Sequence, residues 1–244
     1  MHLDEADSTS NRLIAFCADK DDNVDDFTTI QAEYQSAGKG QKGNHWEAEA
    51  GANLLFSFVL YPTFIPAGRQ FIISKLVSLA VKETLDKYAE GFSIKWPNDI
   101  YWHDKKICGM LIEVFLQGSN MGRCICGIGI NANQTRFISD APNPVSLKQI
   151  TGHDVNRQEL LDSLLTLTEH YYSRLKSDIS GTQAMLEKKY AGALYRREGL
   201  HAYKDKDGQF NAELVNVEPD GRFILRDEEG KQRSYLFKEV QYII

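Results

Sequence analysis

The feature of this chain that most constrains its fold is a glycine-rich segment, residues 38–43, between two predicted strands. The segment matches the pattern G-x-G-x-x-G, which in dinucleotide-binding folds follows a strand and opens a helix. Residues 28–34 do read as a strand, but a second strand at residues 53–60 follows, and no helix pattern begins at the glycines. We therefore exclude a Rossmann site and expect a loop that joins two strands.

This loop combines backbone freedom with positive charge. Its three glycines can adopt positive φ and present successive N–H groups, a geometry that binds anions. Lys39 and Lys42 add two cations in the same place. The loop predicts a site that grips a phosphate during a reaction, although a flexible surface loop explains the glycines equally well.

A second motif favours the functional interpretation. Residues 95–99 read Lys-Trp-Pro-Asn-Asp, which leaves one apolar strand into a tight turn and enters the next strand. Taken alone, Lys95 is explained equally well as a lysine whose stem lies on apolar surface while its amine reaches water. With both motifs in this order, the chain resembles the biotin protein ligases from about residue 7 to residue 244; the matching features are Gln35, the loop 38–43, Trp46, Gly51-Ala52-Asn53 and residues 95–99.

The remaining patterns predict an α+β fold. A long amphipathic helix is expected over residues 67–88, where apolar residues recur at helical spacing. A second helix is expected from Asn156, which opens a variant of the capping box, to about residue 176. Further predictions are a helix at 183–190, one helical turn at 146–151, and strands at 92–96, 100–102, 106–115 and 123–130.

After Arg197 the pattern changes to short strands separated by turns, which predicts a small β-barrel. The strands are expected at 201–203, 210–215, 222–225 and 234–236. The resemblance implies a class II synthetase-like biotin/lipoate ligase catalytic domain over residues 1–192, with a mixed or antiparallel sheet packed by helices. It implies an SH3-like barrel over residues 193–244, which would either dock a carrier protein or cover the ATP site.

The resemblance also implies which residues form the site. Lys95 would be the catalytic residue, pairing with the carboxylate of biotin and then with phosphoryl oxygens. The biotin-binding residues would be Ser8, Thr9, Ser10, Gln35, Lys39, Gly40, Gln41 and Lys95. The ATP- or adenylate-binding residues would be Lys39, Lys42, Trp46, Asn53, Lys106 and Asn131. Mg²⁺ is expected with ATP, but no residue is named as a metal ligand, because Mg²⁺ keeps several waters and takes few protein ligands.

Several of these residues also have purely structural explanations. Ser8, Thr9 and Ser10 precede an apolar face and match a helix N-terminus. Gly127 and Gly129 mark either a β-bulge or a close approach of a ligand. The chain also departs from the family pattern, because Ser10 replaces the usual Asn, and arginines of the loop are replaced by Lys39, Gln41 and Lys42.

The reaction that the resemblance implies has two steps. Biotin and ATP would give biotinyl-5′-adenylate and pyrophosphate, and a lysine of a biotin carboxyl carrier domain would then take the biotinyl group. No enzyme nucleophile is required, and no convincing Ser/His/Asp or Cys/His set is present in the sequence. Two alternatives remain: a lipoate or octanoate ligase or transferase of the same fold, and a non-catalytic binding protein.

Composition excludes other classes. A net charge of −6 argues against a general nucleic-acid binder, and no apolar run reaches the length of a membrane span. The acidic N-terminus has no hydrophobic signal region, so we expect a cytoplasmic protein with reduced, buried cysteines such as Cys124 and Cys126. Because few residues precede Ser8, we expect a monofunctional ligase without a DNA-binding domain, either monomer or homodimer.

Overall fold

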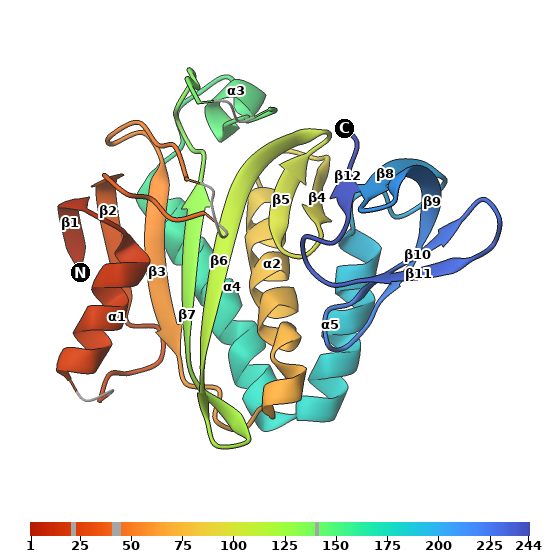
Figure 1. The fold of residues 1–244 in the computed structure, drawn as a ribbon. Coiled ribbons are helices and arrows are strands. Elements are labelled where there is room, and N and C mark those ends of the chain that lie inside the picture. The colour runs from red at the N-terminus through yellow and green to blue at the C-terminus, as the bar shows by residue number, and fades with distance from the viewer. Residues whose placement is uncertain (21–22, 41–44, 140–141) are drawn as a thin grey trace.

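The computed structural model describes residues 1–20, 23–40, 45–139 and 142–244. Its larger part is built on a seven-stranded mixed sheet with the order β1-β2-β3-β7-β6-β5-β4 (Figure 1). Neighbouring strands are antiparallel except β1 and β2, which are parallel. The strands are β1 (His2–Ala6), β2 (Thr29–Gln35), β3 (Leu54–Leu60), β4 (Phe92–Lys95), β5 (Asp99–Trp102), β6 (Lys105–Gln117) and β7 (Asn120–Ile130).

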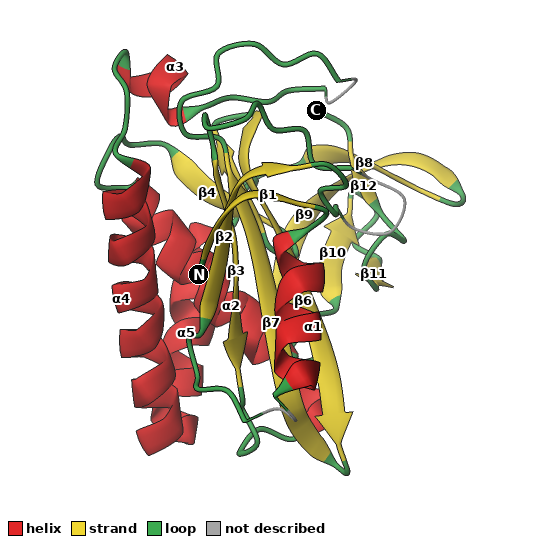
Figure 2. Ribbon diagram, turned by 90° about the vertical axis from the view of Figure 1, so that its left-hand side faces the viewer, coloured by secondary structure: helices red, strands yellow, loops and turns green. Residues whose placement is uncertain are grey.

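Helices cover both faces of this sheet, as Figure 2 shows. One face carries α1 (Thr9–Asp19), and the other carries α2 (Phe71–Leu85), α4 (Arg157–Ser177) and α5 (Ile179–Ala193). Because both faces are covered, β3 is buried along its whole length, which explains its nearly uninterrupted apolar sequence. Two short elements complete this part, the 3-10 turn η1 (Ala67–Arg69) and the helix α3 (Leu147–Thr151).

The predicted helices and strands of this part are confirmed, with shifted ends, but one strand is missed. The polar strand β1 shows no apolar alternation, and it forms because its backbone pairs with β2. The predicted N-cap of α4 is confirmed, since the Asn156 side chain accepts hydrogen bonds from the backbone of Gln158 and Glu159; the Glu159 side chain accepts in return from the Asn156 side-chain amide at 2.9 Å. The bulge explanation of Gly127 and Gly129 is wrong, because β7 pairs in continuous register with β3 from residue 124 to residue 130.

The C-terminal part forms a separate antiparallel sheet with the order β11-β10-β9-β8-β12. Its strands are β8 (His201–Asp205), β9 (Gly208–Val217), β10 (Phe223–Asp227), β11 (Gln232–Tyr235) and β12 (Gln241–Tyr242). Tyr203 and Phe223 are fully buried, and their rings lie 6.2 Å apart. The four predicted strands are confirmed, while β12, with two residues, is too short to produce a sequence pattern.

The turn between β4 and β5 is held by the C-terminal sheet and by α5. The Trp96 indole N–H donates to the carbonyl of Gly221 at 2.9 Å, and its ring stacks on Phe223 with centroids 4.9 Å apart. The Tyr190 hydroxyl donates to the carbonyl of Pro97 at 2.6 Å. In Figure 1 the C-terminal sheet accordingly lies beside the β4–β5 end of the larger sheet. Among the described residues, no helix is long and apolar enough to cross a membrane.

Candidate functional site

A cavity of about 640 Å³ is lined by both parts of the molecule. Its walls come from the start of α1, the end of β2, the edge of the glycine-rich segment, the β4–β5 turn, β6 and β7. The C-terminal part contributes a segment that includes Phe237, Lys238 and Tyr242. A cavity of this size suits a small-molecule ligand of ordinary dimensions.

One end of the cavity is a buried cluster of hydroxyl and amide groups. The Gln35 Oε1 atom accepts hydrogen bonds from the backbone N–H of Thr9 at 2.7 Å and from its hydroxyl at 3.1 Å. The Ser57 hydroxyl lies 2.8 Å from that of Thr9 and 3.0 Å from that of Ser10. Ser8 is also buried, lines the cavity and makes no side-chain cap to α1. These groups can form hydrogen bonds to a polar ligand that is enclosed with them.

Gly127 makes room for this cluster. A side chain at this position of β7 would collide with the Ser10 hydroxyl and touch that of Ser57. The absence of a Cβ therefore allows α1 to place Ser10 directly against the sheet.

Lys95 projects from the end of β4 into the same cavity. Its ammonium group donates to the Tyr101 hydroxyl at 3.0 Å and lies 4.7 Å and 5.0 Å from the ring centroids of Tyr101 and Tyr242. Burial lowers the pKa of Lys95 to about 8, the charges of Lys106 and Arg196 act in the same direction, and Asp99 opposes them. An ammonium ion that is partly desolvated interacts strongly with any anion that enters the cavity.

A second lysine stands beside it in an ion pair. The Lys106 ammonium group lies 2.7 Å from a carboxylate oxygen of Asp99, and both residues line the cavity. Lys106 also lies 5.8 Å from the ring centroid of Trp46. The two lysines give this wall a positive potential, which Asp99 offsets in part.

Trp46 covers a glycine-lined patch of the sheet. A side chain at Gly129 would come within 2.6 Å of the indole, and one at Gly109 within 2.7 Å. The indole N–H of Trp46 is buried and has no hydrogen-bond partner among the described residues. The glycines of β6 and β7 thus accept a large flat side chain close to their backbone.

The two ends of the glycine-rich segment are tied together. Lys39 and His45 form an isolated antiparallel bridge, and the backbone N–H of Trp46 donates to the carbonyl of Gly38 at 3.0 Å. The Lys39 ammonium group lies 3.9 Å from Glu113 of β6. Gln41 and Lys42, which were predicted to contact biotin and nucleotide, lie outside the described residues.

Two residues predicted to contact the nucleotide, Asn53 and Asn131, are buried. Asn53 is fully buried; its amide nitrogen donates to Gln134 at 2.5 Å, and its oxygen accepts from the backbone of Ala132 at 3.0 Å. Asn131 donates to the carbonyl of Val145 at 3.1 Å, while its side-chain oxygen has no partner among the described residues. Neither is among the described residues that line the cavity. Their role as ATP or adenylate contacts stays a prediction.

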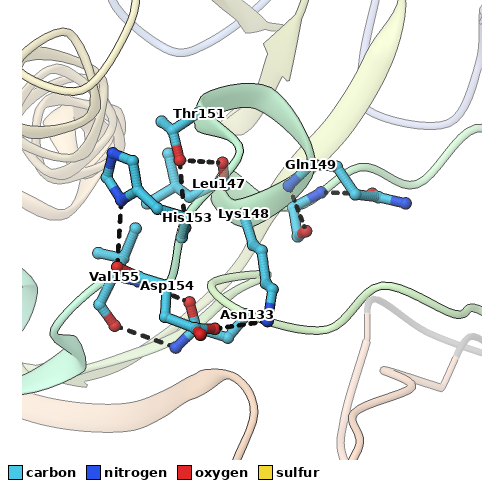
Figure 3. A network of polar contacts seen from close by, with 9 residues as sticks. Asn133, Leu147, Lys148, Gln149, Thr151, His153, Asp154 and Val155 are labelled. Carbon is cyan, nitrogen blue, oxygen red and sulfur yellow. Dashed lines mark hydrogen bonds and ion pairs between the residues drawn. The ribbon is translucent and has the colours of Figure 1, made fainter.

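The segment after Asn131 is held by a compact polar network (Figure 3). The Asn133 side chain donates to the carbonyl of Val155 at 3.0 Å and accepts from its N–H at 2.8 Å. Lys148 of α3 forms an ion pair with Asp154 at 2.8 Å. This network fixes the chain where it leaves β7 and therefore limits the positions open to Asn131.

The comparison with protein families decides the identity of this fold. The model of the biotin/lipoate A/B protein ligase family matches residues 7–131, which is half of the chain and contains both sequence motifs. The chain belongs to this family.

Relatives agree with the assignment to the biotin/lipoate ligases. The bifunctional ligase/repressor BirA of Bacillus subtilis is 28% identical over 223 residues, which cover 87% of this chain and 66% of that protein. The biotin–[acetyl-CoA-carboxylase] ligase of Paracoccus denitrificans is 28% identical over 212 residues, which cover 83% of this chain and 85% of that protein. The chain thus spans slightly less than two thirds of the length of the BirA relative.

The fold agrees as well. The biotin protein ligase from Aquifex aeolicus in complex with biotin and ATP has a TM-score of 0.80 and 28% identity, covering 100% of this chain and 98% of that one. The biotin protein ligase from Leishmania major in complex with biotinyl-5-AMP has a TM-score of 0.64 at 20% identity, and it supports the fold alone. The mixed sheet and the second antiparallel sheet are therefore those of a biotin/lipoate ligase.

Most of the residues that the sequence analysis named for the site lie around one cavity. Of the predicted residues, Ser8, Thr9, Ser10, Gln35, Lys39, Gly40, Trp46, Lys95 and Lys106 line one cavity. Sequence reasoning missed Ser57, because a lone serine in an apolar strand has no pattern, and Gly109, because its partner Trp46 is distant in sequence. It also missed Tyr101, which reaches Lys95 from the neighbouring strand β5, and Tyr242, whose proximity to Lys95 depends on how the two sheets meet.

Proposed function

We propose that this chain is a biotin–carboxyl-carrier-protein ligase, an ATP-dependent enzyme that forms an amide bond. The observation that carries the proposal is the cavity itself, which joins a buried hydroxyl and amide cluster to the partly desolvated ammonium group of Lys95. Such a cavity suits a ligand with a polar ring at one end and a carboxylate at the other, as in biotin. The named activity of the Paracoccus denitrificans relative and the biotin and ATP in the Aquifex aeolicus complex support the proposal.

The first step joins the biotin carboxylate to AMP. A carboxylate oxygen attacks the α-phosphorus of ATP, the bond to the bridging oxygen breaks, and pyrophosphate leaves with the electron pair. Lys95 pairs with the carboxylate before attack and with the phosphoryl oxygens as negative charge develops on them. The cavity walls hold the two reactants together, which supplies a large part of the rate.

In the second step the neutral ε-amine of a carrier lysine attacks the biotinyl carbonyl carbon; the bond from that carbon to the phosphate oxygen breaks, AMP leaves with the electron pair, and the amide nitrogen loses a proton to water. No covalent enzyme intermediate is needed. The buried thiols agree with this route, because burial raises the pKa of Cys108 and of Cys126 and keeps both protonated.

The residues of the site fit Mg²⁺ only as an ion carried by the nucleotide. Asp99 is the one carboxylate among the described residues that line the cavity, and it is paired with Lys106. The described residues contain no group of three acidic, His or Cys side chains that could hold a metal. When bound with ATP, Mg²⁺ supplies charge neutralisation at the phosphates, and we assign it no protein ligand.

We assign the site in two groups. Biotin would contact Ser8, Thr9, Ser10, Gln35, Lys39, Gly40, Gln41 and Lys95, and the nucleotide would contact Lys39, Lys42, Trp46, Asn53, Lys106 and Asn131. The catalytic domain would span residues 1–192, and residues 193–244 would form an SH3-like barrel that docks the carrier protein or covers the ATP site. The acceptor would be a biotin carboxyl carrier domain of a carboxylase. The enzyme would act in the cytoplasm as a monomer or homodimer.

The test is ATP–pyrophosphate exchange with biotin, with lipoate and with neither. We expect exchange that requires biotin, followed by biotin transfer to a carrier domain. Exchange with lipoate alone would agree with the family assignment but would show that the substrate is lipoate and not biotin. Absence of exchange under all three conditions would contradict an adenylating enzyme and favour a binding protein.

A further inference from the structure

The buried serine of β3 has no assigned function in the ligase cavity. Ser57 is fully buried in an otherwise apolar strand, yet its hydroxyl contacts the two α1 residues that line the cavity. A buried hydroxyl costs free energy unless it is hydrogen-bonded. The two hydrogen bonds of Ser57 offset this cost and couple its hydroxyl to the side chains of Thr9 and Ser10.

The order of protons in this cluster follows from one backbone group. The N–H of Thr9 can only donate, so the Gln35 atom 2.7 Å away must be the amide oxygen. That oxygen lies 3.1 Å from the Thr9 hydroxyl, and two oxygens at this distance need a proton between them. The Thr9 hydroxyl therefore donates to Gln35.

The remaining two bonds then have only one consistent direction. Each hydroxyl has a single proton. Since Thr9 has used its proton on Gln35, Ser57 must donate to Thr9 across 2.8 Å, and Ser10 must donate to Ser57 across 3.0 Å. The protons run from Ser10 to Ser57 to Thr9 to Gln35.

This order sets what the cavity presents to a ligand. The Ser10 hydroxyl uses its one proton in the hydrogen bond to Ser57, so toward a ligand its oxygen can only accept a hydrogen bond. Gln35 has committed its oxygen to Thr9, and its amide nitrogen, which has no partner among the described residues, is left to donate. Both residues line the cavity. A cyclic urea carries N–H groups for such an acceptor and a carbonyl for such a donor, whereas a dithiolane ring carries neither.

We propose that Ser57 is a positioning residue that holds Ser10 as a hydrogen-bond acceptor and thereby selects a ureido ring. The inference rests on the proposed function and deepens it. It also accounts for the replacement of the family's usual Asn by Ser10, because a serine acts as a fixed acceptor toward a ligand when its hydroxyl already donates a hydrogen bond to a second hydroxyl. Gly127, which leaves space for the Ser10 hydroxyl, completes the arrangement.

The experiment compares Ser57→Ala, Ser10→Ala and the double variant in biotin-dependent ATP–pyrophosphate exchange. We expect Ser57→Ala to raise KM for biotin by about tenfold, the equivalent of one hydrogen bond, with kcat and the KM for ATP changed by less than about twofold. In the Ser10→Ala background the same substitution should change KM for biotin by less than about twofold, because Ser57 acts through Ser10. Ser78→Ala, which removes another fully buried serine hydroxyl, on α2, serves as the matched control.

Three results would overturn the inference: an unchanged KM for biotin in Ser57→Ala, an equal rise of the KM for ATP, or an equal rise in the Ser10→Ala background. If Ser57→Ala does not fold, Ser57→Cys keeps the shape with a weaker donor and carries the same comparison. Wild-type protein without biotin-dependent exchange would contradict the proposed function and this inference together. Normal wild-type exchange with an unaffected Ser57→Ala would contradict this inference alone.

Discussion

At the scale of single residues, the surroundings of Lys95 change its acid–base chemistry. Its amine lies beside the rings of Tyr101 and Tyr242, and burial lowers its pKa to about 8. The amine is therefore charged below about pH 8 and neutral above it. A neutral amine no longer forms an ion pair with a carboxylate, and it stabilises charge on a phosphoryl group only through a weaker, uncharged hydrogen bond.

The pH dependence of the reaction should report this titration. We expect kcat/KM for biotin to fall by about tenfold per pH unit above roughly pH 8, since this parameter follows the free enzyme. Lys95→Arg should remove that fall, because a guanidinium stays charged, although the rate will be lower. A profile that stays flat to pH 10 would contradict a role for the charged amine.

Removal of the amine should be more severe. Lys95→Ala should lower the exchange rate by about 10²–10³-fold, the usual effect of deleting a group that stabilises transition-state charge. Lys82→Ala, which removes a lysine paired with Asp86 on α2, is the matched control and should leave the rate unchanged. Equal rates for the two variants would refute the assignment of Lys95.

At the scale of elements, the β4–β5 turn depends on its neighbours. The Trp96 indole donates a hydrogen bond to Gly221 and stacks on Phe223, while Tyr190 of α5 donates to the carbonyl of Pro97. Lys95 directly precedes this turn. The position of the Lys95 amine is thus set partly by the sheet of the C-terminal part.

A pair of tryptophan variants tests this dependence. Trp96→Phe keeps an aromatic ring but removes the bond to Gly221, and we expect kcat of exchange to fall by about three- to tenfold, because a displaced catalytic group loses rate. Trp102→Phe removes a similar bond, from the indole to the carbonyl of Glu90 before β4, and should stay within about twofold of wild type. Indistinguishable variants would show that the C-terminal sheet does not position the turn.

At the scale of the whole molecule, the cavity joins the two sheets. Phe237, Lys238 and Tyr242 face the same space as Ser8 and Gln35, from opposite ends of the chain. A ligand that fills the cavity must therefore contact both parts. Binding should stabilise their association as well as each part.

Amide hydrogen exchange measures this coupling. With biotin and ATP bound, we expect slower exchange in the α1 start and in residues 236–242, because ligand contacts suppress local opening at both places. Peptides from the middle of α4 are the internal control, because no α4 residue is among the described residues that line the cavity. Protection confined to residues before 193 would contradict the coupling.

Much of this protein was determined by local sequence. The order of the glycine-rich segment and the Lys-Trp-Pro-Asn-Asp motif predicted the family, and apolar spacing predicted α2, α4 and the buried strands, because these features need only neighbouring residues. The glycine positions 127 and 129 were noticed, but their function was left open. Local pattern can mark a place where space is needed without revealing what fills it.

The tertiary structure decided what fills those spaces. It brought Ser10 of α1 against Gly127 and Ser57, laid Trp46 over Gly129, and placed Tyr242 of the last strand beside Lys95. Each of these contacts joins residues that are distant in the chain, so no periodicity or spacing records them. The direction of the hydrogen bonds in the polar cluster and the lowered pKa of Lys95 arise from those contacts, and for that physical reason they follow from the folded structure alone.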